Sequence, residues 1–72
     1  MTGIQALLFN KDYFTVRQAN EFMSRNNFYK IKPYHITKKY IRARLLQPDY
    51  KKYYYRLGNI AKGVDCIFEF DK

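Results

Sequence analysis

The sequence predicts an α+β domain, in which a small antiparallel sheet of three to four strands packs on one amphipathic helix in β-α-β-β-β order. One observation is a capping box followed by apolar residues at helical spacing. The other is a period-two alternation of apolar and polar residues in later segments. Because one helix covers only one face of such a sheet, the other face is expected to be open.

The first part of the chain predicts a strand followed by the helix. Residues 4–9 (IQALLF) are apolar and end at a polar turn, which is typical of a buried strand. Thr15 and Gln18 have the spacing of a capping box, in which each side chain bonds to the backbone of the other residue. Apolar residues then recur at helical spacing, so a helix is expected over residues 15–26.

The remaining strands are expected after an extended connection at residues 29–34. Residues 36–45 alternate with a period of two, which predicts a strand with a buried row and an outward row. The buried row comprises Thr37, Lys39, Ile41, Ala43 and Leu45, and the outward row comprises Lys38, Tyr40, Arg42 and Arg44. Residues 50–57 favour a strand over a helical turn, residues 58–63 predict a loop, and residues 64–70 predict a last strand.

The length of 72 residues predicts a single domain, residues 1–72, near the lower limit for a self-sufficient core. One cysteine excludes an intrachain disulfide, and one histidine with one cysteine cannot complete a structural zinc site, so neither a metal nor another cofactor is expected. The chain nevertheless has six phenylalanines and eight tyrosines. This supply of aromatic rings without a covalent staple makes a homodimer plausible.

The sequence carries no signal for a membrane or for secretion. No apolar run approaches the about 20 residues of a membrane-spanning helix, and the first residues lack the basic stretch that opens a signal peptide. An unpaired cysteine is typical of a reducing compartment. We therefore expect an intracellular protein that is not secreted.

Positive charge is concentrated in residues 30–56, which contain nine Lys or Arg and one acid and thus account for +8. Residues 1–29 contribute +1 and residues 57–72 contribute −1, so the rest of the chain is neutral overall. Six of the eight tyrosines also lie in residues 30–56. Cations interleaved with flat rings suit a polyanion that offers stackable faces, which describes a nucleic acid.

The side chains expected to contact nucleic acid are basic or aromatic, and they are Lys38, Lys39, Tyr40, Arg42, Arg44, Lys51, Lys52, Tyr54 and Arg56. The basic groups would neutralise backbone phosphates, and the tyrosines would stack on exposed bases. Six phosphate contacts, from Lys38, Arg42, Arg44, Lys51, Lys52 and Arg56, imply that log K falls with log salt at a slope of about −5 on a duplex. Little sequence specificity is expected, because the predicted helix does not offer a base-reading face.

Functions other than nucleic-acid binding are also compatible with the charge pattern. An acidic protein partner is the alternative, with the chain acting as a protein–protein adaptor, and a solvated basic face without any partner is the third reading. No catalytic constellation emerges, since His35 is the single histidine and Cys66 lies in an apolar row, so no enzyme is expected. Asp65, Glu69 and Asp71 would form an acidic patch on one strand face rather than a metal site.

Most of the chain also resembles a family of short proteins of large DNA viruses of eukaryotes, such as marseilleviruses and mimiviruses, with related segments in bacteriophages. The resemblance is carried by QALLFNKDYFTVRQANEFMSRNNFYKIKPYHITKKYIRARLLQP and by YRLGNIAKGVDCIFEF. The matching residues are Phe9, Thr15, Ala19, Phe22, Ile31, Lys32, His35, Thr37, Tyr40, Arg42 and Arg44. Phe22 stands where the family commonly has Trp, and the last strand ends in Phe-Glu-Phe without a glycine.

The resemblance implies a viral protein without an established activity. A viral setting favours DNA over RNA and a role in genome packaging or organisation. It also places the protein in the cytoplasm or nucleus of the infected host, or in the virion. That setting also leaves open a host-directed interaction protein.

Overall fold

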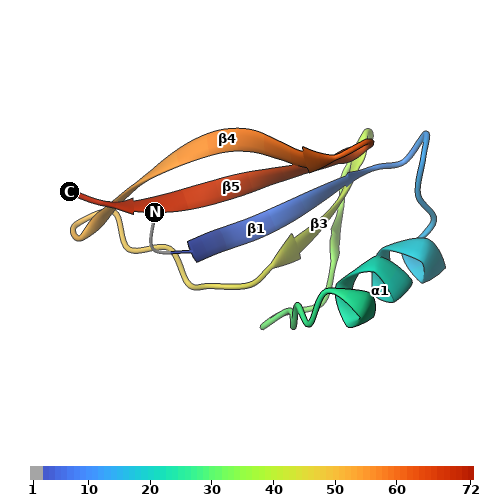
Figure 1. Cartoon of the computed structure of the whole chain (residues 1–72), viewed down its shortest axis with the longest axis horizontal. Helices are drawn as coiled ribbons and strands as arrows, with labels where there is room; N and C mark the ends of the chain where they lie inside the picture. Colours follow the sequence, from blue (N-terminus) through green and yellow to red (C-terminus); the bar gives the residue numbers. More distant parts are fainter. Residues whose placement is uncertain (1–2) are drawn as a thin grey trace.

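The computed structural model describes residues 3–72 and has one helix against one face of an antiparallel sheet (Figure 1). The elements are β1 (Gly3–Asn10), α1 (Val16–Arg25), β2 (His35–Ile36), β3 (Tyr40–Arg44), β4 (Tyr53–Ala61) and β5 (Val64–Asp71). The five strands lie in the order β2-β3-β1-β5-β4, and each neighbouring pair is antiparallel. The predicted α+β class is confirmed, but the sheet has five strands instead of three to four.

The additional strand arises because the segment predicted as one strand folds into a short hairpin. The Thr37 hydroxyl donates to the Tyr40 carbonyl at 3.1 Å and accepts from the Tyr40 amide at 3.0 Å. This side-chain bonding closes a turn over residues 37–39, so β2 and β3 become separate antiparallel partners. Lys38 and Lys39 therefore lie at the hairpin tip, and their predicted places in a strand's outward and buried rows are wrong.

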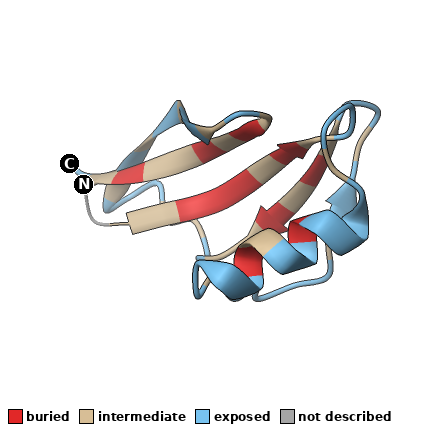
Figure 2. Ribbon diagram, turned by 45° about the vertical axis from the view of Figure 1, so that its right-hand side comes forward, coloured by how far each residue is buried: buried red, intermediate tan, exposed pale blue. Residues whose placement is uncertain are grey.

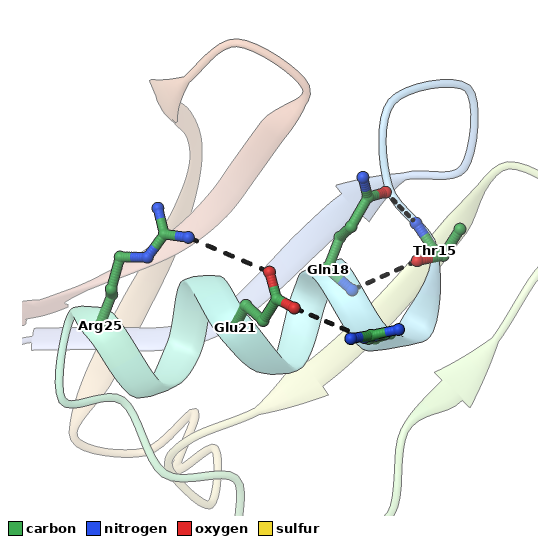
Figure 3. A network of polar contacts seen from close by, with 5 residues as sticks. Thr15, Gln18, Glu21 and Arg25 are labelled. Carbon is green, nitrogen blue, oxygen red and sulfur yellow. Dashed lines mark hydrogen bonds and ion pairs between the residues drawn. The ribbon is translucent and has the colours of Figure 1, made fainter.

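The helix follows the prediction closely. It runs from Val16 to Arg25, with Thr15 as N-cap and Asn26 as C-cap. The Gln18 amide donates to the Thr15 hydroxyl at 3.2 Å, and the Thr15 amide donates to the Gln18 side-chain carbonyl at 2.9 Å (Figure 3). Both bonds of the capping box are thus formed, which satisfies amides that the first helical turn leaves without partners.

The core lies between α1 and the facing sides of the three central strands, as the buried positions in Figure 2 show. Its buried side chains are Leu7, Phe9, Ala19, Met23, Ile41, Ala43, Val64 and Cys66. The register aligns them in rows across the sheet, with Leu7 opposite both Ala43 and Cys66. The alternation predicted for β3 and β5 is therefore confirmed at these positions.

The last two strands form a longer hairpin than the sequence predicts. Residues 58–61 were expected in a loop, but they continue β4, and the turn lies at residues 62–63. The pairing of these residues with β5, from Gly58 with Cys66 to Ala61 with Val64, continues the strand. At Gly58 an added Cβ would lie 2.3 Å from the Phe68 ring. Gly58 is thus a strand glycine that makes room for an aromatic neighbour rather than a turn residue.

Gly58→Ala should destabilise the protein by about 1–3 kcal/mol, because the Phe68 ring must move out of its packing position. Urea denaturation measures the change. Gly3→Ala is the matched control, because its added Cβ would meet Leu46 at an ordinary 3.4 Å. Equal effects of the two substitutions would contradict the steric explanation.

Candidate nucleic-acid interface

The sheet face opposite α1 carries the predicted basic row of β3. Ile41 and Ala43 point to the core, so the alternating Tyr40, Arg42 and Arg44 share the opposite face. All three are half-buried rather than fully exposed. The three side chains share one face as the sequence predicts, but they are half-buried where the prediction has them exposed.

The other predicted contact residues do not join this row. Lys38 and Lys39 lie at the β2–β3 hairpin tip, whereas Lys51 and Lys52 precede β4 at the opposite edge of the sheet. Three strand spacings separate β3 from β4, which is about 14 Å at about 4.8 Å per spacing. The structure therefore divides the predicted site into two groups at opposite edges.

Tyr54 and Arg56 of β4 also lie on the other face from Arg42. They are in register with Phe70 and Phe68, which lie on the same face of β5 as the core residues Val64 and Cys66. Tyr54 stacks on Phe70 with ring centroids 5.2 Å apart and an angle of 14° between the rings. The Arg56 guanidinium lies 5.6 Å from the centre of the Tyr54 ring. This second group is an aromatic and basic patch on the helix side of the sheet.

Acidic side chains on β5 occupy the same face as Arg42. The Tyr40 hydroxyl donates to Asp65 at 3.3 Å, and the Asn59 amide nitrogen donates to the other Asp65 oxygen at 3.0 Å. The Tyr55 hydroxyl donates to Glu69 at 3.0 Å. Burial, followed by the bond and the charge of Glu69, raises the pKa of Tyr55, so this tyrosine remains a donor to the carboxylate.

The open face is therefore divided by charge. Its β3 side is basic and its β5 side is acidic, with Leu8 of β1 between Arg42 and Asp65 in the register. The acidic row that the alternation of residues 64–70 predicts lies on the same face as the basic row, with β1 between them. A polyanion would be attracted to the β3 side and repelled by the β5 side.

Basic side chains converge in a pocket of about 210 Å³ on the β2–β3 side, lined by Lys32, Pro33, His35, Arg42 and Arg44. His35 lies directly opposite Arg42 in the register of β2 and β3. The Ile31 amide donates to the Arg44 carbonyl at 2.8 Å, which holds the segment of Lys32 against β3. No carboxylate lines this pocket.

Sequence reasoning missed Lys32 and His35 as members of this site. Residues 29–34 were expected only as a connection, and His35 was considered only as a catalytic group. The available signal was that a hairpin with its turn at residues 37–39 would pair His35 with Arg42. That signal becomes visible only when the turn at Thr37 is known, because the turn sets which residues pair.

Among residues 3–72, neither Arg42 nor Arg44 of the pocket forms an ion pair. Within residues 3–72 the ion pairs are Arg17–Glu21 at 3.6 Å and Arg25–Glu21 at 4.0 Å, both on the outer face of α1 (Figure 3). The Arg42 Nε–H donor is buried from solvent, and no hydrogen-bond acceptor lies within reach of it in the described residues. Such a buried donor costs about 1–3 kcal/mol when it is left unsatisfied.

Cys66 and His35 cannot act together as a nucleophile and base in this arrangement. Cys66 is 0% exposed and packs on the helix side of the sheet, whereas His35 lines the pocket on the other face. Burial, with a smaller effect of Asp65, raises the pKa of the Cys66 thiol. In the part of the chain that the structure describes, no group of three or more His, Cys, Asp or Glu could hold a metal ion.

The fold defines a small α+β domain with one helix on a five-strand antiparallel sheet. The chain matches no protein-family model, no curated protein and no solved structure. Among residues 3–72, no helix has the length and apolar character needed to cross a membrane.

The Cys66 thiol should react with an aromatic disulfide reagent at least about a hundredfold more slowly in the native protein than in urea. Burial hinders access to the sulfur and disfavours the reactive thiolate. Absorbance of the released thiol at pH 8 measures both rates. Equal rates in native and denatured protein would show that the sulfur is accessible and the core is open.

Arg42→Met should raise the free energy of unfolding by about 1 kcal/mol, because it removes the unsatisfied Nε and keeps an unbranched stem. Urea denaturation in a buffer without multivalent anions measures the change. Arg56→Met is the matched control, since Arg56 is an exposed strand arginine and should change stability by less than about 0.5 kcal/mol. A loss of stability in Arg42→Met would indicate that this guanidinium supports the fold.

Proposed function

We propose that this chain binds nucleic acid, mainly through backbone phosphates, at the basic surface of the β2–β3 hairpin and the segment before it. The observation that carries the proposal is the pocket in which Lys32, His35, Arg42 and Arg44 converge without a carboxylate. Side chains of one charge rarely gather without a counter-charge, because they repel one another. An anionic partner would relieve that repulsion and release counterions from its own surface.

The rest of the hairpin extends the basic surface. Lys38 and Lys39 are exposed at its tip, at the other end of β3 from Arg44. Together with Lys32, Arg42 and Arg44 they supply five cationic contacts along one edge of the sheet. A phosphate backbone that follows this edge stays clear of the acidic row on β5.

Base stacking is assigned to Tyr54 rather than Tyr40. The Tyr40 hydroxyl is bonded to Asp65, and its ring lies half-buried within the sheet face. Tyr54 is 41% exposed and carries Arg56 above its ring. A single strand would have to pass around the sheet to reach both groups, so duplex contacts at the hairpin are the simpler mode.

The resemblance to proteins of large DNA viruses favours DNA over RNA as the ligand. It also favours a role in genome packaging or organisation within the infected host or the virion. Contacts to phosphate carry no sequence information, so binding with little sequence specificity follows from the same geometry.

A protein–protein adaptor is the second candidate, and the aromatic patch on the helix side favours it. Tyr54, Phe68 and Phe70 form a continuous ring cluster on the helix side of β4 and β5. Aromatic residues beside an arginine are typical of the centre of a protein interface. This alternative has two forms, which are a homodimer through this patch and the docking of an acidic protein on the basic face.

Titration with duplex DNA, single-stranded DNA and RNA over a range of salt concentrations tests the leading function. Five contacts at the hairpin predict a slope of log K against log salt of about −4.5 on duplex and about −3.5 on single strands. Contacts that also include Lys51, Lys52 and Arg56 would steepen the duplex slope to about −7. An absence of binding to all three nucleic acids at low salt would refute the proposal.

Arg44→Glu should weaken duplex binding by about tenfold or more at low salt, because it replaces a phosphate contact with a repulsion. Arg25→Glu makes the same change in net charge on the outer face of α1 and should have a much smaller effect. Circular dichroism of both variants checks that the fold is retained. Equal weakening by the two variants would indicate a diffuse charge effect without a defined binding surface.

A further inference from the structure

The basic pocket is smaller than a typical pocket for a drug-sized molecule and large enough for a single anionic group. Its volume is about 210 Å³, and pockets that take drug-sized molecules measure about 300–1,000 Å³. Lys32, His35, Arg42 and Arg44 provide its polar lining, and Pro33 provides a rigid apolar wall. The lining contains an ammonium group, two guanidinium groups and an imidazole as hydrogen-bond donors, and no carboxylate.

The side chains of the pocket are held on positioned backbone. His35 and Arg42 are a directly opposed pair of β2 and β3, and the turn bonds of Thr37 close that hairpin. Arg44 follows two residues along the same strand face, so the two guanidinium stems run side by side. The bond from the Ile31 amide to the Arg44 carbonyl positions the segment that carries Lys32. Donors held in this way bind an anion without a large ordering cost.

An unsatisfied donor gives a second and independent sign of a missing acceptor. Arg42 lines the pocket, and its buried Nε atom has no hydrogen-bond partner among the described residues. More than about nine in ten buried polar groups of native proteins are bonded, so each exception calls for an explanation. An oxygen-rich anion in the pocket would supply acceptors to the guanidinium, whose planar fork matches a phosphate group.

We propose that this pocket binds a phosphate monoester, namely the terminal phosphate of a nucleic-acid strand. This inference rests on the proposed nucleic-acid binding and names the group that the pocket selects. A monoester carries a charge of about −1.5 to −2 near pH 7 and three free oxygens. An internal diester carries a single charge and has two free oxygens, and both of its ester arms must leave the pocket.

The monoester therefore matches the lining better in charge, in acceptor number and in shape. Its single ester arm leaves through the open side and continues as the strand along the basic hairpin. The chain would then bind strand ends in preference to the interior of a strand.

The test compares oligonucleotides of one sequence that end in a 5′-phosphate, a 3′-phosphate or only hydroxyl groups. Fluorescence anisotropy at moderate salt should show about tenfold tighter binding of one phosphorylated form than of the hydroxyl form. Inorganic phosphate should remove this difference by competing for the pocket. Hydrogen and nitrogen NMR shifts of residues 31–44 on addition of phosphate alone should locate the site.

Two double variants that lose the same charge distinguish the effect of the pocket residues from the effect of the protein's net charge. Lys32→Gln with Arg44→Gln should abolish the preference for the phosphorylated end. Arg17→Gln with Arg25→Gln, on the outer face of α1, should retain it, although both double variants lower the net charge from +8 to +6. Lys32→Gln alone, on an exposed segment, serves as the pocket variant if the double variant does not fold.

The outcomes distinguish this inference from the proposed function. Equal binding of all three oligonucleotides would overturn the monoester pocket and leave nucleic-acid binding in place. Binding of inorganic phosphate or a nucleoside monophosphate at the pocket, without binding of any strand, would overturn the proposed function and the assignment to strand ends. Absence of binding by every ligand would overturn both.

Discussion

The register of β1 with its two neighbours is the constraint on which the rest of the structure depends. Leu7 lies opposite Ala43 and Cys66 on the helix side, while Leu8 lies opposite Arg42 and Asp65 on the other side. Because side chains alternate along a strand, a slip of one residue would bury charges under α1 and expose the core. The apolar row of β1 therefore determines both where the helix packs and where the charges lie.

This register also separates the two signs of charge on the open face. Arg42 and Asp65 are two strands apart across Leu8, so they do not form an ion pair within residues 3–72. Tyrosine hydroxyls donate hydrogen bonds to the carboxylates instead, from Tyr40 to Asp65 and from Tyr55 to Glu69. The Asp65 carboxylate thus accepts hydrogen bonds from neutral donors, while no ion pair neutralises Arg42 or Arg44 among residues 3–72. A surface arranged in this way favours an external anion over an internal neutralisation.

The local parts of the fold could be predicted from sequence, whereas the long-range arrangement could not. The Thr15 capping box and the alternation through Ile41 and Ala43 act over a few residues, and both were read correctly. The position of β4 beyond β5 depends on which strands pair across the whole chain, and alternation carries no information on pairing order. For that reason Tyr54 was grouped with the β3 arginines although it lies on the opposite face and at the opposite edge. The partner of the basic surface stays a prediction, since charge alone indicated it.

The Arg42 side chain connects stability with binding in this small domain. A chain without a disulfide or a described metal site has a narrow margin of stability, so an unsatisfied buried donor is a substantial fraction of it. An apolar residue at position 42 would leave the packing of the core unchanged, because the core lies on the other face of the sheet. An anion that bonds only to the folded pocket would offset the cost of Arg42 and stabilise the folded state by mass action. The cost of Arg42 in the free protein is therefore the term that the proposed phosphate in the pocket would offset.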